Sequence, residues 1–157
     1  MPGTVKLIAA LRARGMKIGS TTGYTRSIMK NVLPVAAAQG YVPDKFVCSD
    51  DLIEGRPGPL GIYKCMIDLE VYPPAAILKV DDTGLGIAKA VSAGCVTVGI
   101  ALSGNAVGKT LAELSAMSEA ETAPLRAHST EVLHKAGADD VIDTIRDLPV
   151  LVSRLER

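Results

Sequence analysis

Short apolar segments alternate with helical segments five times along this chain of 157 residues, and the connections between them are short. The segments that we predict as strands are 16–20, 46–48, 75–80, 95–100 and 138–142. Helices are predicted over 4–14, 25–39, 60–69, 85–93, 109–135 (in two pieces) and 144–156. We expect Pro34 to kink or split the second helix. This alternation is typical of one α/β domain, residues 1–157, built on a doubly wound parallel sheet.

The composition agrees with this fold class and excludes several functions. Aromatic residues make up only 3% of the chain, so the core must be built from Val, Ile, Leu and Ala, which suits a parallel sheet covered by helices. Seventeen Lys and Arg balance seventeen Asp and Glu without a basic run, which argues against nucleic-acid binding. The longest uncharged stretch, 90–108, is interrupted by Gly, Ser and Asn, and the N-terminus lacks a signal-peptide pattern. We therefore predict a cytoplasmic protein that does not enter a membrane.

Cysteine usage points to the same compartment. Cys48, Cys65 and Cys95 are an odd number without a CxxC pair, and both histidines are far from them in sequence. A zinc site or a disulfide framework is therefore not expected. We predict three buried thiols in a reducing environment.

Polar side chains follow three of the predicted strands. Ser20 ends the first strand and Thr22 follows it, Arg56 follows the second strand through a short loop, and Asp81 and Asp82 come directly after the third. The carboxyl ends of parallel strands meet at one edge of the sheet, where ligands bind. Hydroxyl and guanidinium groups suit phosphate oxygens, and carboxylates suit Mg²⁺. Together these residues predict a phosphoryl-transfer site.

Each of these residues also has a purely structural interpretation. Thr22 can be an N-cap of the following helix, and one of the two aspartates can cap the helix that begins near Gly84. Arg56 can be a solvated surface charge. The sequence alone leaves both interpretations open.

The order of the motifs resembles the haloacid dehalogenase superfamily, and the local sequences resemble its phosphonoacetaldehyde hydrolase family. Arg56, where most superfamily members have Lys, is the feature that singles out this family. The resembling segments are Lys17–Arg26, Gln39–Tyr41 with Pro43-Asp44, Gly55–Pro57, Val71–Pro73, and Lys79-Val80 with Asp82-Thr83.

The resemblance implies a hydrolase that cleaves the C–P bond of phosphonoacetaldehyde to give acetaldehyde and phosphate, with Mg²⁺ as cofactor. It implies that Thr22 binds the phosphoryl oxygens, that Arg56 neutralises them, and that Asp82 binds the metal. An aspartate nucleophile on a first strand and a Schiff-base lysine in a helical cap complete the family's machinery. The family also implies a homodimer formed mainly through the caps.

Two local departures from the family pattern concern the metal site and a turn. The family often has a second aspartate where this chain has Gly86, and it has a glycine where this chain has Glu70. Asp81 stands where many members have glycine, so it is either a partial replacement or a structural residue. Adjacent strand residues point to opposite faces, so Asp81 and Asp82 are not expected to reach the same Mg²⁺ ion. We therefore expect a lower affinity for the metal.

A larger departure is that no Asp precedes Met16. In the superfamily topology the nucleophile strand lies between the strands predicted here at 16–20 and 75–80. We therefore expect the chain to be the C-terminal portion of a longer enzyme and to be inactive alone.

Three other functions remain to be weighed. One is a different Mg²⁺-dependent phosphatase of the same superfamily, against which Arg56 argues. Another is a non-catalytic phosphate-binding module. A receiver-like signalling domain also has an acidic pair at a strand end, but receivers place that pair early in the chain, whereas Asp81 and Asp82 lie in its middle.

Overall fold

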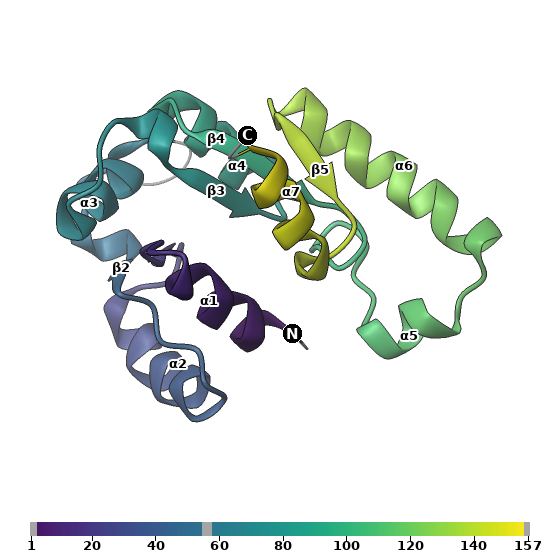
Figure 1. Cartoon of the computed structure of the whole chain (residues 1–157), viewed down its shortest axis with the longest axis horizontal. Coiled ribbons are helices and arrows are strands. Elements are labelled where there is room, and N and C mark those ends of the chain that lie inside the picture. Colours follow the sequence, from purple (N-terminus) through teal and green to yellow (C-terminus); the bar gives the residue numbers. More distant parts are fainter. Residues whose placement is uncertain (1–2, 55–57, 156–157) are drawn as a thin grey trace.

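The computed structural model describes residues 3–54 and 58–155 and confirms an α/β fold with parallel strands (Figure 1). The strands are β1 (Gly19–Thr21), β2 (Lys45–Val47), β3 (Leu78–Asp81), β4 (Val96–Ile100) and β5 (Asp140–Ile142). The α-helices are α1 (Thr4–Ala13), α2 (Arg26–Ala38), α3 (Leu60–Leu69), α4 (Gly84–Ala93), α5 (Leu111–Ala116), α6 (Glu119–Lys135) and α7 (Leu148–Leu155). Three 3₁₀ turns are η1 (Ser49–Asp51), η2 (Pro74–Ala76) and η3 (Ile145–Asp147).

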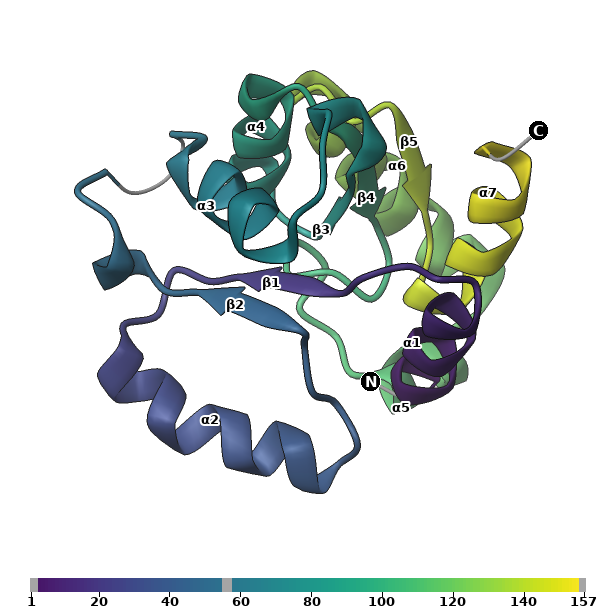
Figure 2. The same ribbon diagram turned by 60° about the vertical axis from the view of Figure 1, so that its left-hand side comes forward.

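The strands form two parallel sheets and not one. β1 pairs with β2, with Gly19 opposite Lys45, and a second sheet has the order β3-β4-β5. Figures 1 and 2 both show β1 between β2 and β3, yet no hydrogen-bonded ladder joins β1 to β3 in the described part of the chain. The interruption falls at the position where the family topology places the nucleophile strand.

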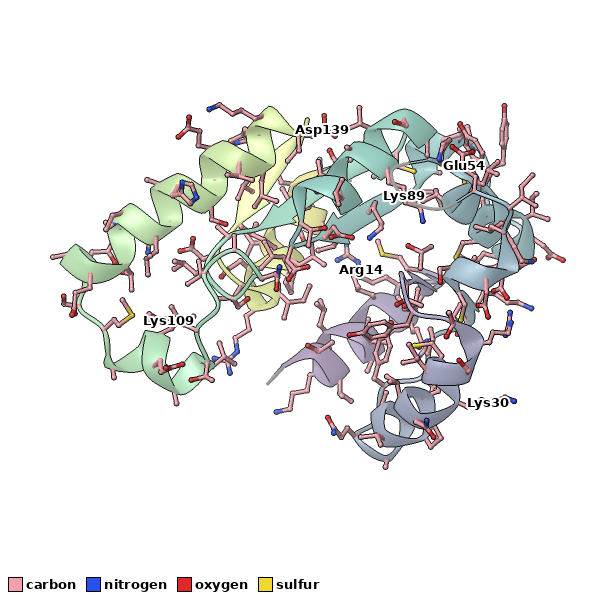
Figure 3. The ribbon with its side chains drawn as sticks, turned by 180° about the vertical axis from the view of Figure 1, so that it is seen from behind. Arg14, Lys30, Glu54, Lys89, Lys109 and Asp139 are labelled. Carbon is pink, nitrogen blue, oxygen red and sulfur yellow. The ribbon has the colours of Figure 1, made fainter. Side chains whose placement is uncertain are left out.

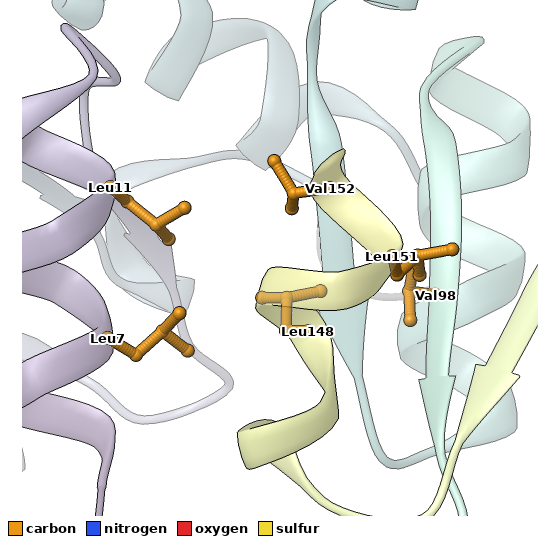
Figure 4. Packing of buried hydrophobic residues seen from close by; sticks show 6 residues of the cluster. All are labelled: Leu7, Leu11, Val98, Leu148, Leu151 and Val152. Atoms are coloured by element: carbon orange, nitrogen blue, oxygen red, sulfur yellow. The ribbon is translucent and has the colours of Figure 1, made fainter. Parts of the chain in front are cut away.

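The β3–β5 sheet is covered by helices on both faces. Val98 of β4 points to one face, where Leu151 of α7 packs on it and Leu7 of α1 joins the same buried cluster (Figure 4). Gly99, the next residue of β4, faces the other side, and a Cβ there would lie 2.9 Å from the side chain of Leu133 on α6. The absence of a side chain at Gly99 lets α6 approach the sheet closely.

The smaller β1–β2 sheet lies between α2 and α3 (Figure 2). Cys65 and Leu69 of α3 pack with Val47 of β2. A Cβ at Gly19 would lie 2.6 Å from Cys65 Sγ, so glycine in β1 allows this close packing. α3 also packs on α4 through the cluster that contains Met66. α3 therefore contacts both the β1–β2 sheet and α4.

Several predicted elements differ from the observed ones; for example, the helix predicted at 144–156 is η3 followed by α7, and β5 begins at Asp140. β1 begins at Gly19, the first residue of the ladder with β2, whereas Met16 and Ile18 before it pack against the core cluster. β3 begins at Leu78 and not at residue 75, because two prolines initiate the 3₁₀ turn Pro74–Ala76. α2 continues as one helix through Pro34, so of the two predicted effects, a kink or a split, the split does not occur.

Other predicted features are confirmed. The segment 109–135 divides into α5 and α6, and Ser118 and Glu121 form a capping box at the start of α6. All three cysteines are buried and free. Among the described residues no helix is long and apolar enough to cross a membrane.

Candidate active site

A cavity of about 240 Å³ lies at the carboxyl ends of β1 and β2. This is the edge at which parallel α/β sheets bind ligands. Its volume is at the small end for ligand pockets, which suits a small ligand. The described residues that line it are Thr22, Gly23, Val47, Cys48, Ser49, Leu52, Glu54 and Lys89.

The backbone of the segment that follows β1 holds the Thr22 hydroxyl at the cavity. The Thr22 N–H donates to the Val47 carbonyl (3.0 Å), which extends the pairing with β2 beyond the strand. Thr22 Oγ1 accepts from the Tyr24 N–H (3.1 Å), as in a hydroxyl-stabilised turn. The N-cap of α2 is Thr25 and not Thr22. The Thr22 hydroxyl accepts one hydrogen bond and retains a proton that it can donate to a ligand.

The loop after β2 is fixed to the start of α2 by an ion pair that the sequence did not reveal. Arg26 binds Asp51 through two hydrogen bonds, Nε to Oδ1 (2.5 Å) and Nη2 to Oδ2 (2.7 Å). Asp51 Oδ2 also accepts from the Cys48 N–H (2.9 Å). The Arg26 guanidinium lies over the Phe46 ring, 5.2 Å from its centre. These contacts hold the β2 side of the cavity against the Thr22 side.

Cys48 also lines the cavity, but it is suited to packing and not to nucleophilic attack. Its side chain is buried, and burial raises the pKa of the thiol, with the nearby Asp51 charge adding to the shift. The thiol is therefore protonated at neutral pH, whereas nucleophilic cysteines are thiolates.

Asp81, the last residue of β3, is held by its neighbours. Its Oδ2 accepts from Lys79 Nζ (2.7 Å), and its Oδ1 accepts from the N–H (3.1 Å) and the hydroxyl (2.9 Å) of Thr83. Burial alone would raise the pKa of Asp81, but the charge and hydrogen bond of Lys79, together with the Thr83 bonds, outweigh it and the pKa is lowered. Thr83 in turn caps α4 by accepting from the Gly86 N–H (3.0 Å). The N-cap of α4 is thus Thr83, so the interpretation that one of the two aspartates caps this helix is wrong.

The Asp81 carboxylate occupies the space beside Gly86. A Cβ at Gly86 would lie 2.0 Å from Asp81 Cγ and 2.1 Å from its Oδ1. The two positions at which this chain departs from the family's metal motif are therefore in contact, and a carboxylate at 81 excludes a side chain at 86.

Asp82 faces the loop that follows β4. Its Oδ2 accepts from the Asn105 N–H (2.8 Å). A Cβ at Gly104 would lie 2.4 Å from the Ile100 carbonyl oxygen and 3.1 Å from Asp82 Cβ, so the chain passes Asp82 where only glycine fits. The contact of Gly104 and Asn105 with Asp82 was not predicted from the sequence, although the Ser-Gly-Asn run after an apolar strand indicates a loop of this kind.

Mg²⁺ prefers several oxygen ligands in octahedral geometry. In the residues that the structure describes, no group of three or more His, Cys, Asp or Glu side chains could hold a metal ion. The carboxylate of Asp81 is bonded to Lys79 and Thr83, which leaves Asp82 as the available metal carboxylate of the pair. A single carboxylate offers fewer oxygen ligands than a complete magnesium site needs.

The structure brings together only some of the predicted site residues. Thr22 lines the cavity, whereas Ser20, inside β1, and Asp82, after β3, are not among its described lining residues. Arg56 lies outside the described residues. Thr22 and Asp82 belong to different sheets because β1 and β3 do not pair, so the cavity and the aspartate are two separate parts of the site.

Comparison with known proteins shows the family of the chain. A haloacid dehalogenase-like hydrolase family model matches residues 1–94. The chain is 47% identical over 152 residues to a phosphonoacetaldehyde hydrolase of Klebsiella pneumoniae subsp. pneumoniae, covering 96% of this chain and 56% of the relative. It is 44% identical over 156 residues to the Paraburkholderia phytofirmans phosphonoacetaldehyde hydrolase, covering 99% and 58%.

Solved structures show the same relationship. A phosphonoacetaldehyde hydrolase-like protein from Oleispira antarctica superimposes with a TM-score of 0.96 at 38% identity, over 100% of this chain and 57% of that one. A hydrolase from Pseudomonas syringae matches with a TM-score of 0.69 at 20% identity over 99% of this chain and 59% of that one, which supports the fold alone.

The chain belongs to the haloacid dehalogenase-like hydrolase family. Within it, the chain is a homologue of the phosphonoacetaldehyde hydrolases, and it spans a little more than half the length of the relatives cited above.

Proposed function

We propose that this chain provides the phosphoryl-binding part of a phosphonoacetaldehyde hydrolase and does not catalyse the reaction alone. The observation that carries the proposal is the small cavity at the carboxyl ends of β1 and β2, into which Thr22 presents a hydroxyl. The reaction breaks the C–P bond: the carbon keeps the electron pair and takes up a proton, and water supplies the oxygen that completes phosphate.

The chain's own residues have binding roles in this proposal. Thr22 donates a hydrogen bond to a phosphoryl oxygen, and Arg56 neutralises the phosphoryl charge. Asp82 provides one carboxylate ligand to Mg²⁺, which when bound neutralises charge on the transferring group. Asp81 is a structural residue, because its bonds to Lys79 and Thr83 occupy both of its oxygens.

The nucleophile and the Schiff-base lysine are proposed to come from sequence outside these 157 residues. The relatives are nearly twice as long as the matched region, since 56% and 58% of their lengths are covered. The unjoined β1 and β3 support this proposal, because the family's nucleophile strand would lie between them. We call the part of the Klebsiella relative that lies outside its match to this chain the complementing segment.

The experiment measures acetaldehyde release with a coupled alcohol dehydrogenase. The chain alone, the complementing segment alone and their mixture are compared, and the segment with the matching part of its own Klebsiella protein serves as a positive control. We expect release only in the two mixtures. Release by the chain alone would show that a nucleophile lies within it. No release from the mixture, when the positive control is active, would contradict the hydrolase proposal.

A non-catalytic phosphate-binding module is the second candidate, favoured by the cavity beside Thr22, which can hold a small anion without a nucleophile. Phosphate binding by the chain with no acetaldehyde release from the mixture would support it.

A further inference from the structure

The cavity beside Thr22 contains a buried lysine that the mechanism above does not use. Lys89 lies on α4, its side chain is only 7% exposed, and it lines the cavity together with Thr22 and Ser49. Figure 3 shows Lys89 and Glu54 at the same end of the molecule. Lysine side chains are rarely this buried in proteins.

A glycine on the neighbouring helix creates the space for this ammonium group. A Cβ at Gly61 would lie 2.5 Å from Lys89 Nζ and 3.3 Å from Lys89 Cε. Gly61 is the second residue of α3, so the ammonium packs against the first turn of that helix. The N-terminal turn of a helix carries partial positive charge. Lys89 and the start of α3 thus place positive potential at the same point, where an anion is favoured.

The remaining lining groups fit a small oxyanion. Thr22 and Ser49 offer hydroxyl donors, and Val47, Cys48 and Leu52 provide an apolar wall. Among the described lining residues, Lys89 supplies the positive charge and Glu54 the carboxylate. Glu54 is exposed, whereas Lys89 is buried, so the positive charge lies on the inner side of the cavity.

We propose that Lys89 is a phosphoryl-binding residue whose ammonium group donates to an oxygen of the tetrahedral phosphorus anion that Thr22 also binds. The ligand class is inorganic phosphate or an alkylphosphonate. This inference rests on the proposed function for the identity of the substrate, but the binding itself requires no turnover. The competing explanation is that Lys89 only stabilises the packing of α3 on α4.

The experiment titrates the 157-residue chain with inorganic phosphate and with methylphosphonate, which lacks an aldehyde, by calorimetry and by ³¹P NMR. Lys89→Met removes the charge at nearly constant volume, and Lys89→Arg keeps it. Lys30→Met is the matched control, because Lys30 is an exposed lysine on α2, well separated from Lys89 in Figure 3. Thr22→Val tests whether the same cavity is occupied.

We expect Lys89→Met to weaken binding of both anions by about ten- to a hundredfold, the usual effect of losing one charge-assisted hydrogen bond. Lys89→Arg should give intermediate affinity, Lys30→Met should leave affinity unchanged, and Thr22→Val should weaken it. Glu54→Gln should tighten binding, because it removes a carboxylate that repels the anion.

Wild-type affinity in Lys89→Met would overturn the inference, and so would a lowered melting temperature with unchanged affinity, which is the signature of a packing role. If Lys89→Met does not fold, Glu54→Gln decides, and unchanged or weaker binding would count against the inference. Absence of anion binding by the wild-type chain would also overturn it. The hydrolase proposal is judged separately, by acetaldehyde release from the mixture.

Discussion

Because Asp81 and Gly86 are in contact, we expect the effects of substituting them on the free energy of unfolding to be coupled. Gly86→Ala would place a methyl group 2.0–2.2 Å from three atoms of the Asp81 carboxyl group. The carboxylate would have to rotate away and give up its bonds to Lys79 and Thr83. Overpacking of this kind costs about 1–3 kcal/mol, and a lost hydrogen bond to a charged group about 1.5–3 kcal/mol. The better helix propensity of alanine returns about 1 kcal/mol. We expect a net loss of about 2 kcal/mol.

The second substitution reverses the sign of this effect. Asp81→Ala alone should destabilise the chain, because Lys79, whose side chain is 17% exposed, loses its carboxylate partner. Once that carboxylate is absent, the methyl group of Gly86→Ala has space. In the Asp81→Ala background, Gly86→Ala should therefore be neutral or stabilise by up to about 1 kcal/mol. The double-mutant cycle should give a coupling free energy of about 2–3 kcal/mol.

The assay is urea unfolding followed by circular dichroism at low protein concentration. A loss of 2 kcal/mol corresponds to a midpoint lowered by about 1 M urea. Gly84→Ala is the matched control, because it is in the first turn of the same helix and its Cβ would meet Ala136 at an ordinary 3.5 Å. If Gly86→Ala costs the same in both backgrounds, the carboxylate of Asp81 is not what excludes a side chain at position 86.

Four further predictions follow from the site and the sheets. In the mixture with the complementing segment, Arg56→Ala should lower kcat/KM by about 10²-fold. Arg56→Lys should have an intermediate kcat/KM, because lysine keeps the charge but lacks the guanidinium group that binds two oxygens. Equal activity of the wild type and both variants would show that Arg56 is a solvated loop residue. The pKa of Asp81 is lowered in the folded state. The carboxylate therefore contributes to stability above the unfolded pKa of about 3.9, and this contribution is lost as pH falls through the folded pKa. The melting temperatures of Asp81→Asn and of the wild type should converge at low pH. Gly104→Ala should destabilise by about 2 kcal/mol, since its Cβ would meet the Ile100 carbonyl oxygen at 2.4 Å, and an unchanged melting temperature would contradict this. Light scattering after size exclusion should show that the chain self-associates through the β1 and β3 edges, and that the complementing segment reduces this; a monodisperse monomer with cooperative unfolding would contradict it.

Sequence patterns predicted the bounds of an element well where turn-forming residues such as proline stand at its ends. α3 has the predicted bounds, Leu60–Leu69, because prolines precede it and its apolar face is regular. The start of β3 was misplaced because the turn-forming tendency of Pro73 and Pro74 outweighed the apolar run that follows.

The candidate site was predictable in its residue types but not in its division of roles. The sequence of a strand-end Asp pair does not show which of the two carboxylates is bonded to other protein groups. Here it is Asp81, because Lys79, two residues before it, donates to its carboxylate. Lys89 carried no sequence signal, since its position depends on the packing of α3 on α4 and on the space at Gly61, which are properties of the tertiary structure.

The interruption between β1 and β3 constrains the strand that would complete the sheet. We expect it to run parallel to its neighbours, because every strand pair in the described part of the chain is parallel. Helices already cover both faces of the molecule on either side, so such a strand would be buried on both faces and should be a continuous apolar run. Its carboxyl end would then lie between Thr22, which follows β1, and Asp82, which follows β3. A single carboxylate placed there would be next to both the hydroxyl proposed to bind the phosphoryl group and the aspartate proposed to bind Mg²⁺, which follow strands of two separate sheets.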